Sequence, residues 1–128
     1  MGTAKRMDPE PVLRSASALT GNAVVNVGGE KLGTLEDIMM DLGSGQVHFA
    51  ILVREDDRLV AVPWDALALD PRDQRLVMDI DKAKFDKAPS FDRNSRPEMG
   101  REWEVKVEGF FGRKPFWDMV EERWIGGP

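Results

Sequence analysis

Short apolar runs separated by turn residues dominate the first two thirds of this chain. The clearest stretch lies between Gly28 and Trp64, where three β-favouring runs are separated by two turn signals. Within the middle run, Val47, Phe49 and Ile51 alternate with other residues and therefore share one face of a strand. This pattern predicts an antiparallel meander.

Glycine and aspartate mark the turns of this meander. Gly28 and Gly29 both tolerate positive φ, so we expect them to form a type I′ hairpin turn. Gly45 belongs to the next turn, and Asp41 precedes it, where an aspartate accepts backbone N–H bonds. These residues are therefore predicted to be structural.

The second run contains a break in its alternation. Leu35 has an odd number, whereas Ile38 and Met40 have even numbers, so a regular strand cannot place all three on one face. A β-bulge near Glu36 and Asp37 would absorb one residue and bend the strand, and the Asp37 carboxylate would satisfy donors that the bulge frees. Such a bend lets a short sheet curl into a barrel.

The expected fold is mainly β, a small antiparallel barrel of about six strands with a short helix. Pro63 has no N–H for a ladder, so its strand must end or lie at an edge there, with Trp64 as an anchoring aromatic. A helical turn is expected at about 15–21, and Asp81 is placed to cap a short helix at 82–87. Strands are expected at about 23–27, 31–42, 47–53, 59–64, 66–69 and 75–80.

The last segment is unusually aromatic. Trp103, Val105 and Val107 alternate with charged residues, which predicts a half-buried strand. Residues 115–125 carry apolar side chains at helical spacing, which predicts an amphipathic helix. Aromatic residues dominate interface anchors, so the candidates for interaction are Trp103, Phe110, Phe111, Phe116, Trp117 and Trp124.

These patterns divide the chain into four parts. We expect a disordered leader at 1–14, a barrel domain at 15–91 and a linker at 92–100. The aromatic extension at 101–128 is expected to pack on the barrel or on a partner subunit.

Composition narrows the classes of function. The formal charge of −5 disfavours direct nucleic-acid binding, which relies on basic residues that neutralise phosphates. The absence of cysteine removes disulfides and thiolate metal sites. No apolar run approaches the roughly 20 residues of a transmembrane helix, and the start has no secretory signal. We therefore expect a cytoplasmic protein.

Candidate chemistry is sparse. His48 is the single histidine and has no cysteine or second histidine as a co-ligand, so a structural role is expected. Asp37 and Asp41 resemble a carboxylate pair, but no nucleophile or base accompanies them. The turn at 43–45 joins two strands and lacks the third glycine of a phosphate loop. We expect no catalytic residue, no metal and no cofactor.

Several short features follow one another along the chain: Leu19-Thr20-Gly21, Gly29-Glu30-Lys31-Leu32-Gly33, Leu35-Glu36-Asp37-Ile38, Met40-Asp41, Gly45-Gln46-Val47, Val62-Pro63-Trp64 and Ala88-Pro89-Ser90-Phe91. Taken in this order, they resemble the PRC-barrel family. This is the small β-barrel of the cytoplasmic domain of the photosynthetic reaction centre H subunit and of the C-terminal domain of the bacterial ribosome maturation factor. The resemblance covers about residues 15–91 and implies a barrel of about six strands, frequent self-association and no general catalytic set.

Three functional hypotheses follow. The first is a non-enzymatic protein-interaction or scaffold module, homodimeric because a domain of this size buries a modest fraction of its surface alone. By resemblance, its partner would belong to photosynthetic or other membrane complexes. The second is a ribosome or RNA-maturation accessory factor that binds a ribosomal protein, and the third is a small-molecule binder that uses the barrel mouth.

Overall fold

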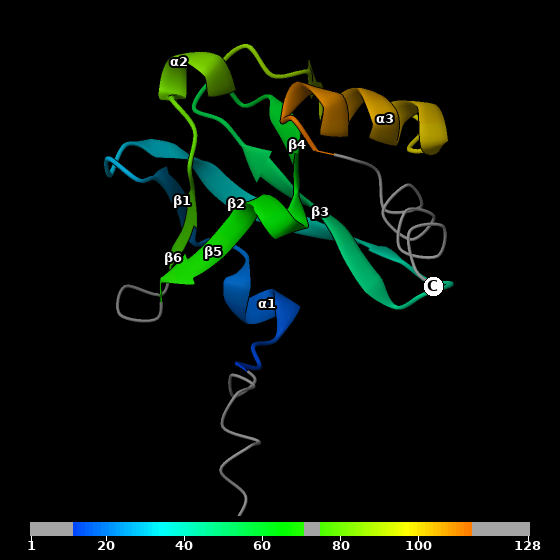
Figure 1. Ribbon diagram of the computed structural model, residues 1–128, viewed down its shortest axis with the longest axis horizontal. Helices are drawn as coiled ribbons and strands as arrows, with labels where there is room; N and C mark the ends of the chain where they lie inside the picture. Colours follow the sequence, from blue (N-terminus) through cyan, green and yellow to red (C-terminus); the bar gives the residue numbers. More distant parts are fainter. Residues whose placement is uncertain (1–11, 71–74, 114–128) are drawn as a thin grey trace, which may run out of the picture.

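A computed structural model describes residues 12–70 and 75–113 of the 128. Its strands form one seven-stranded sheet in the order β5-β6-β1-β2-β3-β4-β7 (Figure 1). The elements are α1 (Ala16–Leu19), β1 (Ala23–Asn26), β2 (Lys31–Asp41), β3 (Gln46–Val53), β4 (Leu59–Pro63), the 3₁₀ helix η2 (Trp64–Ala66), β5 (Leu67–Asp70), β6 (Arg75–Met78), α2 (Lys82–Phe85), β7 (Ser90–Phe91) and α3 (Arg101–Phe110).

The sheet differs in two respects from the expected antiparallel barrel of about six strands. Over the described residues it ends at β5 and β7 and is not a closed barrel. The neighbours β1 and β6 also run parallel, with Val24 opposite Leu76. The antiparallel prediction is wrong for this pair because β1 and β6 are non-consecutive strands joined by a long connection, and alternation within a strand does not encode such a partner.

The predicted bulge in β2 is confirmed. The pairing with β3 skips one residue between Leu35 and Asp37, and the Ile38 N–H donates to Oδ1 of Asp37 at 2.8 Å. A second irregularity lies between Met39 and Met40. Beyond it β2 stays paired with β3 as far as Asp41, but the Met40 side chain is 52% exposed.

Two apolar clusters cover β3 and β4 on opposite faces of the sheet. The first contains Ala50 and Leu52 with the α2 residue Phe85. The second contains Phe49 and Ile51 with Val107 of α3. Successive β3 side chains enter opposite clusters because a strand alternates its faces, and both faces are therefore buried.

The strand expected at Trp103 to Val107 is wrong, since these residues belong to α3. The helix buries Trp103 partly and Val107 almost fully, at an i, i+4 spacing, and leaves Val105 51% exposed. In Figure 1, α3 lies beside β4. The second cluster joins the two elements, because it contains Val107 of α3 and Leu59 and Ala61 of β4. Trp103, Val105 and Val107 also fit the period of two of a strand. Packing of Trp103 and Val107 against the sheet selects the helix.

Turn predictions were accurate in position and partly in detail. Gly29 has a φ of +89°, but the φ of Gly28 is not positive. The type I′ assignment, which required positive φ at both glycines, is therefore wrong. The Gly29 N–H instead donates to the Asn26 carbonyl, and the one left-handed residue of this turn is Gly29. Gly45 has a φ of +77°, as its turn requires. Asp81 occupies the N-cap of α2, but its side chain makes no capping bond.

Candidate docking groove

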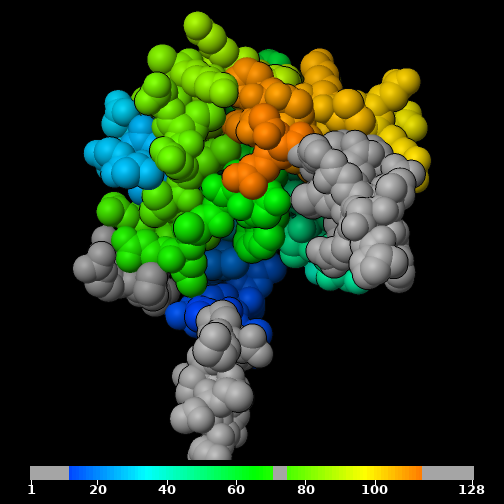
Figure 2. Space-filling view, in the orientation of Figure 1, coloured from blue at the N-terminus to red at the C-terminus, as the bar shows by residue number. Residues whose placement is uncertain are grey.

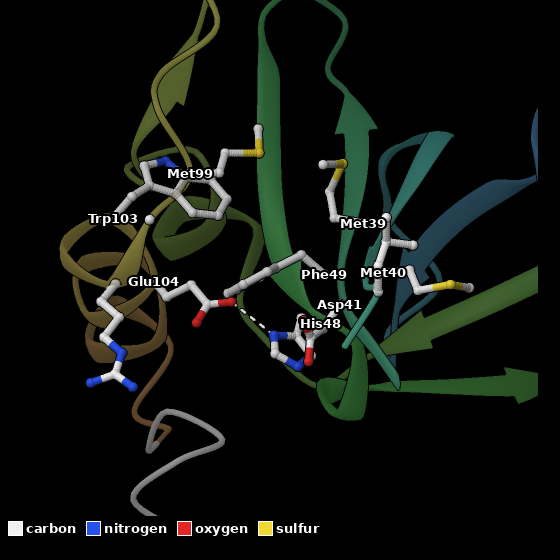
Figure 3. Close-up of a pocket in the computed structure, with 11 residues that line it drawn as sticks. Met39, Met40, Asp41, His48, Phe49, Met99, Trp103 and Glu104 are labelled. Atoms are coloured by element: carbon white, nitrogen blue, oxygen red, sulfur yellow. Dashed lines mark hydrogen bonds and ion pairs between the residues drawn. The ribbon is translucent and has the colours of Figure 1, made fainter. Parts of the chain in front are cut away.

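A groove of about 510 Å³ lies between the far end of the β2–β3 hairpin and the first turn of α3. Its apolar lining consists mainly of Met39, Met40, Leu42, Phe49, Met99 and Trp103. Figure 3 shows Met99 and Trp103 on the α3 side and Met39 and Met40 on the strand side. The groove therefore depends on two segments about 50 residues apart in the chain.

The strands position one wall of the groove. Met39 pairs with Phe49 across β2 and β3, and both side chains belong to the second apolar cluster or pack against it. The irregularity after Met39 turns Met40 outward, and Leu42, just beyond the strand, is 89% exposed. The wall thus passes from buried to exposed apolar surface.

The helix positions the other wall. The Trp103 ring meets the Phe49 ring edge to face, with centroids 5.0 Å apart and planes at 66°. This geometry is favourable because the positive edge of one ring faces the negative face of the other. It fixes the first turn of α3 against β3.

A polar contact reinforces this wall. His48 Nδ1 lies 2.8 Å from Oε1 of Glu104, and each side chain is 16% exposed (Figure 3). Both residues line the groove. His48 therefore connects the sheet to α3. This contact could not be predicted, because the sequence pattern indicated a strand, and not a helix, around Glu104.

Glu108 follows Glu104 by one helical turn and is a buried carboxyl outside the lining of the groove. It is 9% exposed, and its Oε1 has no hydrogen-bond partner among the described residues. Burial, followed by the negative charges of Asp65 and Glu104, raises its pKa to about 7, against opposing effects of Arg113 and His48. A helical period would have revealed that Glu104 and Glu108 share a face.

The candidate carboxylates Asp37 and Asp41 act on the backbone. Asp41 accepts N–H bonds from Gly43 and Ser44, each at 3.2 Å, and hydrogen bonds with Ser44 and Gly43 lower its pKa. Asp37 serves the bulge and also lies 3.9 Å from Nη2 of Arg96. Both carboxylates thus accept hydrogen bonds from backbone N–H groups.

The interaction candidates are divided between the groove, the core and the undescribed residues. Trp103 lines the groove. Phe110 and Phe111 pack edge to face at 4.9 Å and contact the first cluster. Phe116, Trp117 and Trp124 lie outside the described residues. Of the expected structural residues, Pro63 ends β4 in a buried position and Trp64 begins η2 against the first cluster.

Among residues 12–70 and 75–113, no group of three or more histidine, aspartate or glutamate side chains is placed to hold a metal ion. No helix in the same ranges has the length and apolar character needed to cross a membrane.

Comparison with known proteins gives one family. The model of the PRC-barrel domain matches residues 11–85, which is more than half of the chain. No curated protein matches the chain.

Proposed function

Because the chain belongs to the PRC-barrel domain family, we propose that it is a non-enzymatic module that docks a partner protein in the β2–β3/α3 groove. The domain type is in general a protein-interaction module. The observation that carries this proposal is the open, methionine-lined groove with Met40 and Leu42 exposed at its rim.

The chemistry of the groove suits a protein surface. Contiguous exposed apolar area is uncommon on soluble monomers and tends to mark interaction sites. Methionine side chains adapt to irregular partners and make favourable contacts with aromatic rings. Trp103 adds a large, half-buried aromatic of the kind that anchors interfaces.

Affinity capture with the full chain tests the proposal. The groove variant carries Met40→Glu and Leu42→Glu, which add two charges at exposed positions without entering either apolar cluster. The matched control carries Leu13→Glu and Val27→Glu, at positions 84% and 71% exposed and away from the groove. We expect one protein to be recovered by the wild type and the control and lost from the groove variant.

Equal recovery by all three baits would show that the partner binds elsewhere. The identity of the captured protein also separates the partner classes. A component of a photosynthetic or other membrane complex would support the scaffold hypothesis, whereas a ribosomal protein would support the accessory-factor hypothesis.

We further propose that the module is a cytoplasmic homodimer. The support for a dimer is that β5 and β7 end the sheet over the described residues, leaving strand edges where a second copy can pair. The absence of cysteine suits a reducing compartment. Sedimentation equilibrium of the full chain at several concentrations is expected to give twice the mass of one chain, and a single-chain mass throughout would contradict the dimer.

A small-molecule binder is a second candidate, favoured by the volume of the groove. At about 510 Å³ it lies within the range of about 300–1,000 Å³ typical of ligand pockets, and His48 and Glu104 supply polar groups. A metabolite screen by thermal shift tests it. A compound that raises the Tm of the wild type and not of the groove variant would support this function, and a screen without such a compound would count against it.

A further inference from the structure

We propose that, in the partner-free protein, the groove is occupied by the C-terminal segment of the same chain, residues 114–128. This inference rests on the proposed function, because the segment would compete with the partner for the same apolar surface. It assigns an occupant to the groove and gives the module a built-in regulation.

The end of α3 determines where the segment begins. Phe111 caps the helix, the Gly112 N–H donates to the Gly109 carbonyl, and the Arg113 N–H donates to the Glu108 carbonyl at 2.8 Å. With Gly112 at a φ of +71°, these two bonds form a Schellman motif. The left-handed residue turns the chain away from the helix axis, so the following residues need not continue along it.

An ion pair fixes this exit point. Nη1 of Arg113 lies 3.6 Å from Oδ1 of Asp65, a residue of η2. In Figure 2, the orange end of α3 lies directly above the green segment that contains η2. The segment therefore starts at one end of α3, and the groove lies at the other end, around Gly100 to Glu104.

The segment is long enough to bridge this separation. The ten residues of α3 span about 15 Å. The 15 residues from 114 to 128 would span about 22 Å as a helix and up to about 50 Å if extended. Either conformation covers the length of α3, so reach does not limit docking.

The side chains of the segment match those of the groove. Trp117, Val120 and Trp124 are spaced i, i+3 and i+7, the spacing of one apolar helical face. Met39 and Met99 supply polarisable sulfur in the groove, and thioethers make favourable contacts with aromatic rings. An aromatic face opposite a methionine surface is thus chemically complementary.

Covalent linkage favours this occupant over a free partner at low concentration. A short tether gives the segment a local concentration on the order of millimolar. A separate protein at lower concentration must therefore bind the groove with higher intrinsic affinity to compete. A partner with higher intrinsic affinity would displace the segment. The expected consequence is that Trp117→Ala with Trp124→Ala increases partner capture several-fold relative to the wild-type chain.

Paramagnetic broadening in the full chain tests the inference directly. The chain has no cysteine, so Glu122→Cys provides a unique site for a nitroxide. Residue 122 lies opposite Trp117, Val120 and Trp124 on a helical projection, so the label leaves that face unchanged. The reporters are the ¹³C-labelled methyl groups of Met39, Met40 and Met99, with Met78 of the first cluster for comparison.

We expect the three groove methionines to lose more than half of their signal when label and isotope are on the same chain, diluted in unlabelled protein. The loss should disappear with Trp117→Ala and Trp124→Ala. A nitroxide at Val27→Cys, in the turn between β1 and β2, should leave these signals intact. This turn leads into Lys31, which lies about 30 Å along β2 from Met40.

Two results would overturn the inference. One is unchanged groove signals in the Glu122→Cys sample. The other is broadening that appears only when a spin-labelled chain is mixed with a separate isotope-labelled chain, because the segment would then dock on a second copy. Neither result affects partner capture by the groove variant, so failure here is distinguishable from failure of the proposed function.

Discussion

His48 Nδ1 on β3 lies 2.8 Å from Glu104 Oε1 on α3, across 56 positions of sequence. The contact is part-buried, with each side chain 16% exposed, so it is less weakened by solvent than a surface pair. Together with the ring contact between Phe49 and Trp103, it fixes the helix that forms one wall of the groove.

The first prediction concerns the strength of this contact. A double-mutant cycle with His48→Ala and Glu104→Ala is expected to give a coupling free energy of about 1–2 kcal/mol in urea unfolding. The control cycle uses Lys82 and Asp86, an i, i+4 pair at 3.3 Å that is 37% and 50% exposed. Its coupling should be about 0.3–0.5 kcal/mol, and equal couplings in the two cycles would refute a special role for His48.

The second prediction follows from the raised pKa of Glu108. Burial, Asp65 and Glu104 raise this pKa to about 7 from an ordinary value of 4.5. The folded state therefore binds the proton more tightly, and the associated stability is present below pH 4.5 and is lost as pH rises through about 7. Glu108→Gln should stabilise the protein by about 2 kcal/mol at pH 8 and far less at pH 5.

Urea unfolding at the two pH values measures this difference. Glu102→Gln, on the exposed face of α3, is the matched control. Its effect on the free energy of unfolding should be small and the same at both pH values. A Glu108→Gln protein with the same pH dependence as the wild type would contradict the assigned burial.

The third prediction separates the helical from the extended form of residues 101–110. In α3, Val107 is 2% exposed and Val105 is 51% exposed, whereas a strand would place both on one face. Val107→Ala should cost about 1–3 kcal/mol, and Val105→Ala should cost less than about 0.5 kcal/mol. Similar losses for the two variants would favour the strand.

The fourth prediction concerns the close approach of β2 and β3. A Cβ atom on Gly33 would lie 2.7 Å from the Val53 carbonyl oxygen, so Gly33→Ala must move backbone. The expected cost is about 1–3 kcal/mol. Gly109→Ala, where a Cβ meets no atom within 4 Å, should instead stabilise α3 by about 0.4–1 kcal/mol, and the two thermal unfolding curves should shift in opposite directions.

The β-meander and its bulge could be predicted because both depend on residues close in sequence. Alternation located β3 and β4, and the shift in alternation after Leu35 located the bulge. The parallel pairing of β1 with β6 could not be predicted, because it joins two strands that are far apart in the sequence. Residues 101–110 were misassigned because Trp103, Val105 and Val107 fit both periods until packing against the sheet selects one.

The groove was missed for the same reason. Its methionines were unremarkable as separate residues of a strand and a linker. Met39 and Met99 come to line one groove, from opposite walls, only when α3 is placed. The sequence did single out Trp103 as an interaction candidate, and it is the aromatic residue on the α3 wall of this groove.

Titration of the captured partner tests the central claim, that the β2–β3/α3 groove docks a protein, most directly. Isothermal titration of the full chain should show that Met40→Glu with Leu42→Glu weakens binding at least about 30-fold, as expected for interface residues worth about 2 kcal/mol. The Leu13→Glu, Val27→Glu control should stay within about twofold of wild type. Equal Kd values for the groove variant and the control would contradict the account.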